Sequence, residues 1–296
     1  MKDYSSILII YNPGAMKGEI ENHIPRIKQR LLLRFSIVDS MSSQDINGAE
    51  ILAQKYASKY DIIVSCGGDG TLNQVINGVM KSGENTAVGI LPCGTCNDVA
   101  RTLNIPKKLD QAVDSLLRLN IIRYDLMYDG SRYMSYSLAT GYMTKCSYSA
   151  TSKSKKRFGR FAYVITAIKD LFNVDKLPIT VTADGERLHG KFLYCMLVNG
   201  VSVGGFKMNK DDNLSDGKVK LVMIRRTKGL GSLFAMIKLF IGGIRSVKNN
   251  KHVIIRDVSK VFIENHANSP FTMDGEKIKF LKKNVSVVSS LEVIKG

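Results

Sequence analysis

The stretch SCGGDGTLNQVING, residues 65–78, decides the fold of this chain. It follows the apolar run Asp61 to Cys66, which predicts a short buried strand, and it leads into apolar residues at helical spacing, among them Val75 and Val79. Glycines at such a strand-to-helix turn let the backbone approach a polyphosphate, and the amides and dipole of the following helix attract its charge. The stretch therefore predicts a phosphate-binding turn inside a β-α unit.

The first 120 residues repeat this alternation of buried strand and amphipathic helix. Further strands are expected at Ser6 to Tyr11, Phe35 to Asp39 and Ala87 to Leu91. Between them, apolar residues recur at helical spacing, as in Ile20, Ile24, Ile27 and Leu31. This rhythm predicts an α/β fold in which a parallel sheet carries helices on both faces.

After about Tyr124 the pattern changes to period-two runs separated by turn signals. ITVTADGERLHGKFLYCMLVNG and FTMDGEKIKF each place Asp-Gly between two strand-like arms, which is a strong hairpin signal. One helix, roughly Arg160 to Asn173, is expected to interrupt these strands. We therefore expect a nucleotide-binding domain over residues 1–124 and a β-rich domain over 125–284, with a strand at 285–296 that can return to the first domain.

The 296 residues carry a formal net charge of +17, and the charge is uneven. Arg132 to Lys169 contains eight Lys or Arg and no acid, which favours nucleic acid, an anionic membrane or phosphates as a partner, or else a solvated face. The apolar run near the first residues is too short for a signal peptide, which predicts a cytosolic protein. The run Gly229 to Ile244 has 16 residues and carries Lys238, so it is too short to cross a membrane.

Cys93 and Cys96 form a C-x-x-C motif that raises the question of a redox or zinc site. The chain has five cysteines and no second C-x-x-C or H-x-x-x-H pair to complete a structural zinc site. We interpret both cysteines as small side chains in a loop.

A second loop with polar and acidic residues follows the next predicted strand, which ends at Leu91-Pro92. Its sequence, CGTCNDVAR, brings a Gly-Thr-polar-acid cluster to the sheet edge where residues 67–71 also lie. Asp69, held beside phosphates, is a natural contact for Mg²⁺. Two such loops on one edge indicate a nucleotide site much more strongly than one loop would.

The motifs together resemble the diacylglycerol kinase catalytic family, and specifically its soluble bacterial lipid kinases. NPGAMKG, GGDGTLNQVING, PCGTCNDVAR and MDGE resemble four family motifs in order, and FGRFAYVITAIK resembles a helix of the family's second domain. Gly-Gly-Asp-Gly-Thr is shared with NAD kinases and phosphofructokinases, whereas the Gly-Thr-x-Asn-Asp loop selects lipid kinases. The resemblance implies an NAD kinase/phosphofructokinase-like domain followed by an antiparallel β-sandwich.

The resemblance also assigns residues to ATP and to catalytic Mg²⁺. Asp69 and Asp98 would organise the metal, and Asp125 would join them through water or be an ordinary Asp at the start of a strand. Asn97 would orient the second loop. The residues implied to line the ATP phosphates are Asn12, Gly67, Gly68, Gly70, Thr71, Asn73 and Thr95.

A structural Mg²⁺ loop and a general base complete the implied site. NLSDGKV would bind Mg²⁺ through Asp216 and the carbonyls of Asn213 and Lys218, or it is a simple Asp-Gly turn. Asp-Gly-Glu occurs at residues 184–186 and 274–276, and the second position matches the family's base.

Glu276 is therefore the expected base, with Asp274 as a supporting or alternative base. The first loop departs from the family because Ala15 and Met16 replace its usual Ser-Gly, and Lys17-Gly18 could compensate.

The expected function is an ATP- and Mg-dependent lipid kinase that converts diacylglycerol to phosphatidic acid. The alternatives are an NAD kinase-like enzyme and a non-catalytic relative that binds membrane or nucleic acid. The expected partner is a lipid at an anionic membrane, reached by peripheral association through Arg132 to Lys169 and the run Gly229 to Ile244. Nucleic acid is not expected as a partner, and a homodimer is left open.

Overall fold

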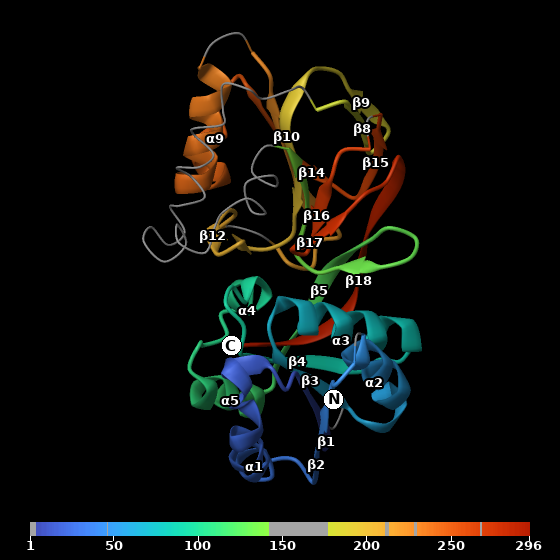
Figure 1. Ribbon diagram of the computed structural model, residues 1–296, viewed down its shortest axis with the longest axis vertical. Coiled ribbons are helices and arrows are strands. Elements are labelled where there is room, and N and C mark those ends of the chain that lie inside the picture. The colour runs from blue at the N-terminus through green and yellow to red at the C-terminus, as the bar shows by residue number, and fades with distance from the viewer. Residues whose placement is uncertain (1–3, 46, 142–176, 211–212, 228–229, 267) are drawn as a thin grey trace.

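The structure is a computed structural model that describes residues 4–45, 47–141, 177–210, 213–227, 230–266 and 268–296. A parallel sheet in the order β2-β1-β3-β4 forms the centre of the first domain (Figure 1). Its strands are β1 (Ser6–Tyr11), β2 (Ile37–Ser42), β3 (Ile62–Gly67) and β4 (Ala87–Pro92), and they are followed by β5 (Asn120–Tyr128) and β6 (Tyr133–Met134).

Helices cover both faces of this sheet. The helix α1 packs with α5 on one face, and α2 packs with α3 on the other (Figure 1). Because both faces are covered, β3 and β4 are buried along their whole length, which explains their continuous apolar sequences. The helices are α1 (Ile20–Leu31), α2 (Gly48–Tyr56), α3 (Asp69–Ser82), α4 (Asp98–Thr102) and α5 (Leu109–Arg118), with 3₁₀ turns η1 (Ala15–Gly18) and η2 (Ala57–Lys59).

One long strand, β18 (Lys282–Lys295), belongs to both domains. Its first part pairs antiparallel with β15 (Lys260–Asn265), and from Ser286 onward it pairs antiparallel with β5. Near its end Val293 lies opposite Val88 of β4 in a parallel pairing. The sheet of the first domain therefore continues through β18 into the second domain.

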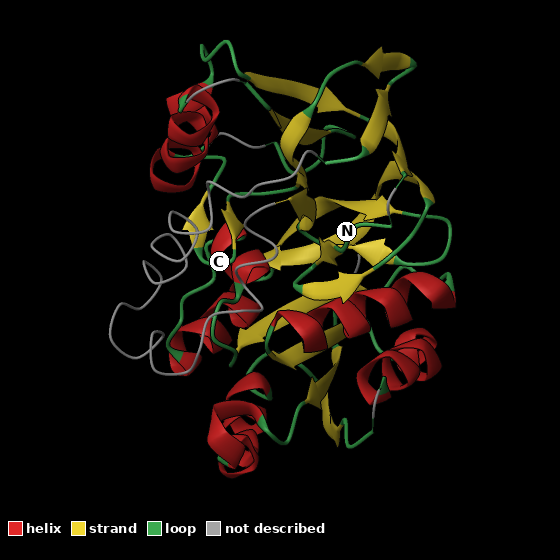
Figure 2. Ribbon diagram, turned by 45° about the horizontal axis from the view of Figure 1, so that its top comes forward, coloured by secondary structure: helices red, strands yellow, loops and turns green. Residues whose placement is uncertain are grey.

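The second domain is a sandwich of two sheets (Figure 2). One is the continuation β18-β15-β8-β9, and the other is antiparallel with the order β14-β13-β10-β7-β16-β17. The remaining strands are β7 (Ser137–Gly141), β8 (Ile179–Ala183), β9 (Glu186–Leu188), β10 (Phe192–Val198), β11 (Ser202–Val203), β12 (Phe206–Lys207), β13 (Val219–Arg225), β14 (Val253–Val258), β16 (Phe271–Met273) and β17 (Glu276–Ile278).

The antiparallel sheet is buried on both faces. In β13, Leu221 and Met223 point into the core between the sheets, whereas Val222 and Ile224 point into a second core on the other face. The helix α9 (Gly231–Gly242), followed by the turn η4 (Ile244–Val247), covers that second face. This explains why β10 is apolar throughout and why β13 is continuously apolar from Leu221 to Ile224 rather than alternating.

The expected fold class is confirmed: a helix-flanked parallel sheet precedes an antiparallel β-sandwich. Two details differ from the sequence expectations. The second strand begins at Ile37 instead of Phe35, because Phe35 is buried in the turn before it, and α9 is a helix that the sequence pattern did not predict. The expected helix Arg160 to Asn173 lies outside the described residues. In the ranges that the structure describes, no helix is long and apolar enough to cross a membrane.

Candidate active site

Two glycine-containing loops meet at the carboxyl ends of β3 and β4. A Cβ on Gly94 would lie 2.4 Å from the Cα of Gly68, so only glycine allows the two backbones to come this close. The amide of Cys93 donates to the carbonyl of Gly67 at 2.8 Å and extends the contact. The two motifs that sequence analysis placed at one edge of the sheet are therefore in direct contact.

Asp69 joins these loops through its side chain. It opens α3, and its two oxygens accept the amides of Asn97 at 2.8 Å and Asp98 at 2.7 Å. Burial raises the pKa of Asp69 to about 6, the nearby charge of Asp98 adds to the rise, and the amide donors offset part of it. Asp69 thus positions the second loop while its carboxylate lies next to another acid.

Asn97 holds the second loop in shape. Its Oδ1 accepts the amide of Gly94 at 3.0 Å, and its Nδ2 donates to the carbonyl of Gly94 at 2.8 Å. Thr95, between them, is exposed at the tip of the loop. The loop is therefore rigid at its base and presents Thr95 to solvent.

The first loop follows β1 and runs beside β3. Asn12 donates its amide to the carbonyl of Cys66 at 3.1 Å, and its Oδ1 accepts the amide of Gly14 at 2.8 Å. Met16 and Lys17 have φ of 52° and 62°, a left-handed conformation that favours glycine. Met16, which stands at one of the two positions that depart from the family, and Lys17 therefore have a strained backbone.

Asp98 connects the second loop to the other domain. It is fully buried, and its Oδ1 accepts the hydroxyl of Ser202 at 2.5 Å and the amide of Gly205 at 2.8 Å. Its Oδ2 accepts the amide of Gly204 at 2.7 Å. The hairpin of β11 and β12 is therefore clamped onto an acid of the first domain.

Asp274 is buried where the C-terminal hairpin meets the first domain. Its Oδ2 accepts the side-chain amide of Asn73 and both the amide and the hydroxyl of Ser135, and its Oδ1 accepts the amides of Tyr136 at 3.0 Å and Ser137 at 2.9 Å. Burial raises the pKa of Asp274 above its usual range, although these donated hydrogen bonds oppose the rise. Five donors fill this carboxylate, so it positions the hairpin.

Glu276 is the accessible acid of the same hairpin. Its side chain is 55% exposed, and its Oε2 lies 3.1 Å from Nη1 of Arg132. Nη2 of Arg132 donates to Oδ1 of Asn73 at 3.1 Å. Because Asn73 is one helical turn after Asp69, the Glu276 hairpin lies beside the glycine-rich turn of the first domain.

Tyr136 lies among the acids of both domains. It is 5% exposed, and a Cβ on Gly275 would lie 3.3 Å from its hydroxyl oxygen. Burial raises the pKa of the Tyr136 phenol far above its usual value, and the charges of Asp274, Asp69 and Asp98 raise it further. The phenol therefore lies within electrostatic range of acids from both domains.

Asp125 carries a polar atom without a partner. Its Oδ2 accepts the amide of Gly217 at 2.8 Å, and its buried Oδ1 has no hydrogen-bond partner. In the adjacent loop, the side chains of Asn213 and Asp216 accept amides two residues ahead, those of Ser215 and Lys218. This is the hydrogen bonding of an Asp-Gly turn docked on Asp125, and the predicted structural Mg²⁺ site stays a prediction.

The oxygen atoms of the site are suitable ligands for Mg²⁺. This ion prefers hard oxygen ligands and is often bound by one or two carboxylates together with substrate phosphates. The carboxylate of Asp69 has about four lone pairs, and the amides of Asn97, Asp98 and Val99 do not occupy all of them. Oδ1 of Asp125, beside the turn at Gly217, is unpartnered. Within the described ranges, no three His, Cys, Asp or Glu side chains form a metal-binding cluster. A metal here would therefore depend on phosphate oxygens for the rest of its ligands.

The cysteines pair differently from their motif. The Sγ of Cys93 lies 3.7 Å from the Sγ of Cys66, the single cysteine of β3, whereas the backbone carbonyl of Cys96 accepts Nε of Arg101. All cysteines in the described part of the chain are free thiols.

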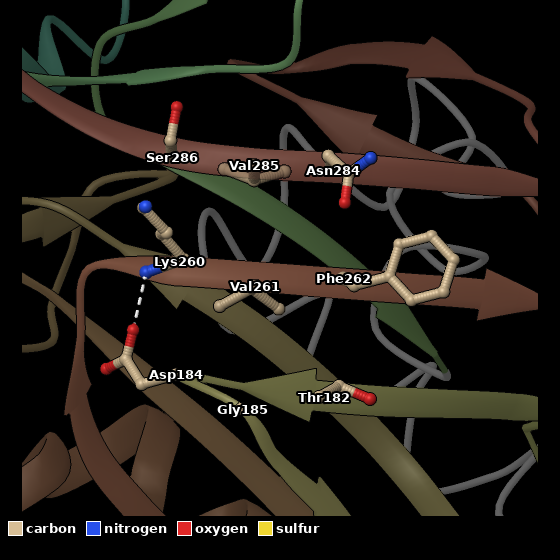
Figure 3. Close-up of a pocket in the computed structure, with 9 residues that line it drawn as sticks. All are labelled: Thr182, Asp184, Gly185, Lys260, Val261, Phe262, Asn284, Val285 and Ser286. Atoms are coloured by element: carbon tan, nitrogen blue, oxygen red, sulfur yellow. Dashed lines mark hydrogen bonds between the residues drawn. The ribbon is translucent and has the colours of Figure 1, made fainter.

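A separate hollow of about 290 Å³ lies on the second domain (Figure 3). It is lined by β15 and β18 residues such as Val261 and Val285, and its only carboxylate is Asp184. That carboxylate accepts the amide of Lys260 at 2.7 Å and the hydroxyl of Ser259 at 2.9 Å. The hollow therefore lacks the acids and loops that a phosphoryl-transfer site needs.

Sequence reasoning did not identify several residues of the site. Arg132, Ser135 and Tyr136 follow β5 in a segment without a recognisable motif. Gly204-Gly205, in contrast, has a recognisable sequence signal. Two consecutive glycines between strand-like residues indicate a turn whose amides can bind an anion. The second-domain donors to Asp98 could have been suspected from that signal.

Comparison with known proteins places both domains in one family. Residues 6–128 match the Diacylglycerol kinase catalytic domain, and residues 136–295 match the YegS C-terminal NAD kinase beta sandwich-like domain. A diacylglycerol kinase from Staphylococcus carnosus (strain TM300) is 29% identical over 270 residues, covering 90% of this chain and 87% of the relative. A diacylglycerol kinase from Staphylococcus aureus (strain MRSA252) is 29% identical over 272 residues, covering 90% and 85%.

Solved structures share the fold across the whole chain. A diacylglycerol kinase from Bacillus anthracis str. Sterne superposes with a TM-score of 0.79 at 20% identity, covering 100% of this chain and 98% of that chain. A further structure from the same strain gives a TM-score of 0.85 at 22% identity, covering 100% and 97%. The likeness extends over both domains and over the arrangement between them.

Proposed function

The chain belongs to the diacylglycerol kinase family, and from this premise we propose that it transfers the γ-phosphoryl group of ATP to the hydroxyl of a lipid alcohol, with Mg²⁺ as cofactor. The expected substrate is diacylglycerol and the product phosphatidic acid. One observation carries the proposal: Nδ2 of Asn73, on α3, donates to Oδ2 of Asp274 at 2.8 Å. This bond holds an Asp-Gly-Glu hairpin of the second domain against the glycine-rich turn of the first.

The first domain would hold the nucleotide. Backbone amides at Gly68, Gly70 and Gly94 and the N-terminus of α3 suit the phosphates. Asn12 and Thr95, both exposed at neighbouring loops, would flank them. Asp69 and Asp98 would hold Mg²⁺, which neutralises charge on the phosphates when bound.

The second domain would supply the general base. The lipid hydroxyl oxygen forms a bond to the γ-phosphorus, the bond from that phosphorus to the bridging oxygen of ADP breaks, and Glu276 accepts the hydroxyl proton. Glu276 suits this role because it is the exposed acid of its hairpin, whereas the oxygens of Asp274 are filled by five donors. Asp274 then acts as the positioning residue for Glu276, and Arg132 holds Glu276 near Asn73.

A kinase assay tests the proposal. Purified protein with labelled ATP and Mg²⁺ should phosphorylate diacylglycerol in mixed micelles, in a panel with a sphingoid base, phosphatidylglycerol and an isoprenoid alcohol. Asp69→Asn should abolish the transfer at saturating Mg²⁺. Phosphorylation of NAD⁺ with no labelled lipid in any micelle would reject the lipid kinase in favour of an NAD kinase-like enzyme.

A further inference from the structure

The helix α9 is apolar on two opposite sides. Its inner side, with Met236, Leu239 and Phe240, is buried against the antiparallel sheet. On the outer side, Phe234 is 57% exposed, Ile241 is 68% exposed, and Leu230 just before the helix is 51% exposed. Apolar residues on the outer side do not contribute to the core, so core packing does not explain why they are apolar.

The outer residues form one stripe. At 3.6 residues per turn, Leu230, Phe234, Ile237 and Ile241 fall within an arc of about 60°. We call these four residues the α9 stripe. A surface patch of this kind, made of large side chains in register on one helix, is typical of an interaction site.

The charge around the α9 stripe selects its partner. From Lys218 to Arg256 the chain contains no Asp or Glu and carries ten Lys or Arg. Two of these, Lys220 and Arg256, are paired with Asp257 and Glu186 on the sheet. Lys238, Arg245 and Lys248 are exposed on α9 and directly after it. An apolar stripe edged by cations is complementary to a bilayer with anionic headgroups.

A second copy of the chain is less suitable as the occupant. In a symmetric dimer the same patch would face itself, so the cations after α9 would meet cations with no acid within the segment to pair with them.

We propose that the α9 stripe is the surface through which this protein docks onto anionic membranes, with Phe234 and Ile241 entering the interfacial layer. This proposal rests on the proposed function, because a lipid kinase must bring its active site close to a bilayer. The α9 stripe contains no residue of Arg132 to Lys169, and most of that segment lies outside the described residues.

The contacts of α9 connect the stripe to the candidate active site. Phe240 packs edge to face on Phe206 of β12, with ring centroids 5.8 Å apart, and the amide of Ile244 donates to the carbonyl of Met208 at 2.7 Å. The same β11–β12 hairpin donates two amides to Asp98. Figure 1 shows α9, β12 and α4 one below another along one edge of the molecule. A bilayer on α9 would therefore lie on the side of the molecule where the β11–β12 hairpin contacts Asp98.

Vesicle binding without ATP or diacylglycerol tests the docking independently of catalysis. The wild type should sediment with phosphatidylglycerol-containing vesicles, and Phe234→Ser with Ile241→Ser should weaken its partition coefficient at least tenfold. The matched control is Leu33→Ser with Ile51→Ser, since these residues of the first domain are 82% and 61% exposed. The control should bind as the wild type does, and both doubles should keep the wild-type melting temperature.

A charge-reversal pair tests the electrostatic part. Lys238→Glu with Lys248→Glu should weaken binding at least tenfold at low salt and flatten its salt dependence, whereas Lys55→Glu with Lys59→Glu on the first domain should not. Unchanged binding of the Phe234/Ile241 double, or an equal loss in the Leu33/Ile51 control, overturns the proposal. Light scattering that shows a wild-type dimer and a monomeric Phe234/Ile241 double also overturns it, because the stripe is then a subunit interface.

A short-chain, water-soluble diacylglycerol separates the docking from the proposed function. The Phe234/Ile241 double should phosphorylate it within twofold of the wild-type rate while losing most activity on vesicles. A wild type that binds vesicles through the stripe but phosphorylates neither substrate rejects the kinase activity and retains the docking surface.

Discussion

The same three residues, Asp-Gly-Glu, form two turns in this protein, and the turns have different surroundings. The hairpin of β8 and β9 turns at Asp184 and Gly185 with φ of 46° and 87°, and the hairpin of β16 and β17 turns at Asp274 and Gly275 with φ of 45° and 89°. These are matching two-residue turns with positive φ at both positions. Local sequence therefore determines the turn.

The surroundings determine what each acid can do. Asp184 is exposed and accepts three donors from Ser259 and Lys260, and Asp274 is buried and accepts five donors. Glu186 pairs with Arg256 on the sandwich surface, whereas Glu276 pairs with Arg132 beside α3. The turn therefore sets the backbone geometry, and the contact between the domains determines what its acids can do.

The largest expected difference is in catalysis. Glu276→Gln should lower kcat of lipid phosphorylation about thousandfold, because a general base contributes roughly 10²–10⁴ in rate. Glu186→Gln should leave kcat unchanged, since its carboxylate pairs with Arg256 of β14 on the sandwich surface. Steady-state kinetics with labelled ATP measures both. Equal losses in the two variants would mean that position relative to α3 does not matter.

The next difference is in stability. Asp274→Asn should lower the free energy of unfolding by about 3 kcal/mol, because an amide group cannot accept all five buried donors. Asp184→Asn should cost no more than about 1 kcal/mol, since solvent replaces its lost partners. Urea unfolding measures both values. If Asp184→Asn lowers the free energy of unfolding as much as Asp274→Asn does, burial does not explain the difference between the two turns.

Smaller effects are expected at the two glycines. Alanine at a positive φ is strained, so Gly185→Ala and Gly275→Ala should each lower the free energy of unfolding by about 1 kcal/mol. The two positions also differ in the room for an added methyl group. A Cβ on Gly275 would lie 3.3 Å from the Tyr136 hydroxyl, whereas a Cβ on Gly185 would have no atom within 4 Å. Thermal unfolding should therefore give the lower melting temperature for Gly275→Ala, and the reverse order would contradict the contact with Tyr136.

The smallest effect is a difference in pH dependence. Slight burial opposes the shift, but hydrogen bonds from Lys260 and Ser259 lower the pKa of Asp184 below its ordinary 3.8. The contribution of Asp184 to the free energy of unfolding is therefore present above pH 3.8 and is lost as pH falls through the lowered pKa. The pKa of Asp274 is raised, so its pH-dependent contribution has the opposite sign and is lost as pH rises.

Unfolding of Asp184→Asn and the wild type between pH 6 and 3 measures the first effect. The difference in free energy of unfolding between the wild type and Asp184→Asn should decrease as pH falls. A gap that widens toward acid would mean that the hydrogen bonds to Asp184 do not favour its ionised form.

Much of the fold could be predicted from sequence because its signals are local. The buried runs of β1, β3 and β4 and the Asp-Gly turns depend on neighbouring residues. The helix α9 could not be recognised as a helix, because apolar side chains on two of its sides obscure the 3.6-residue period. The dual role of β18 depends on pairing with β4, β5 and β15, which no local pattern encodes.

The candidate site was predictable in its motifs and not in its contacts. Asp69 and Asp98 were placed on one sheet edge from strand order, and their loops do touch. Sequence reasoning treated Asp98 as a metal ligand alone, whereas Ser202, Gly204 and Gly205 also bind it from more than 100 positions away. Likewise, the contact between Cys66 on β3 and Cys93 directly after β4 joins residues 27 positions apart, and the interpretation of Cys93 as a small loop side chain did not include it.

The shared strand β18 has a consequence for synthesis on the ribosome. During translation β4 and β5 emerge long before residues 282–295, so their pairing edges stay open until that strand arrives. Contacts between such distant segments are slow to form, and open strand edges attract other chains. The first domain therefore cannot complete its sheet before residues 282–295 have been made, and we expect nascent chains to need protection from aggregation until then.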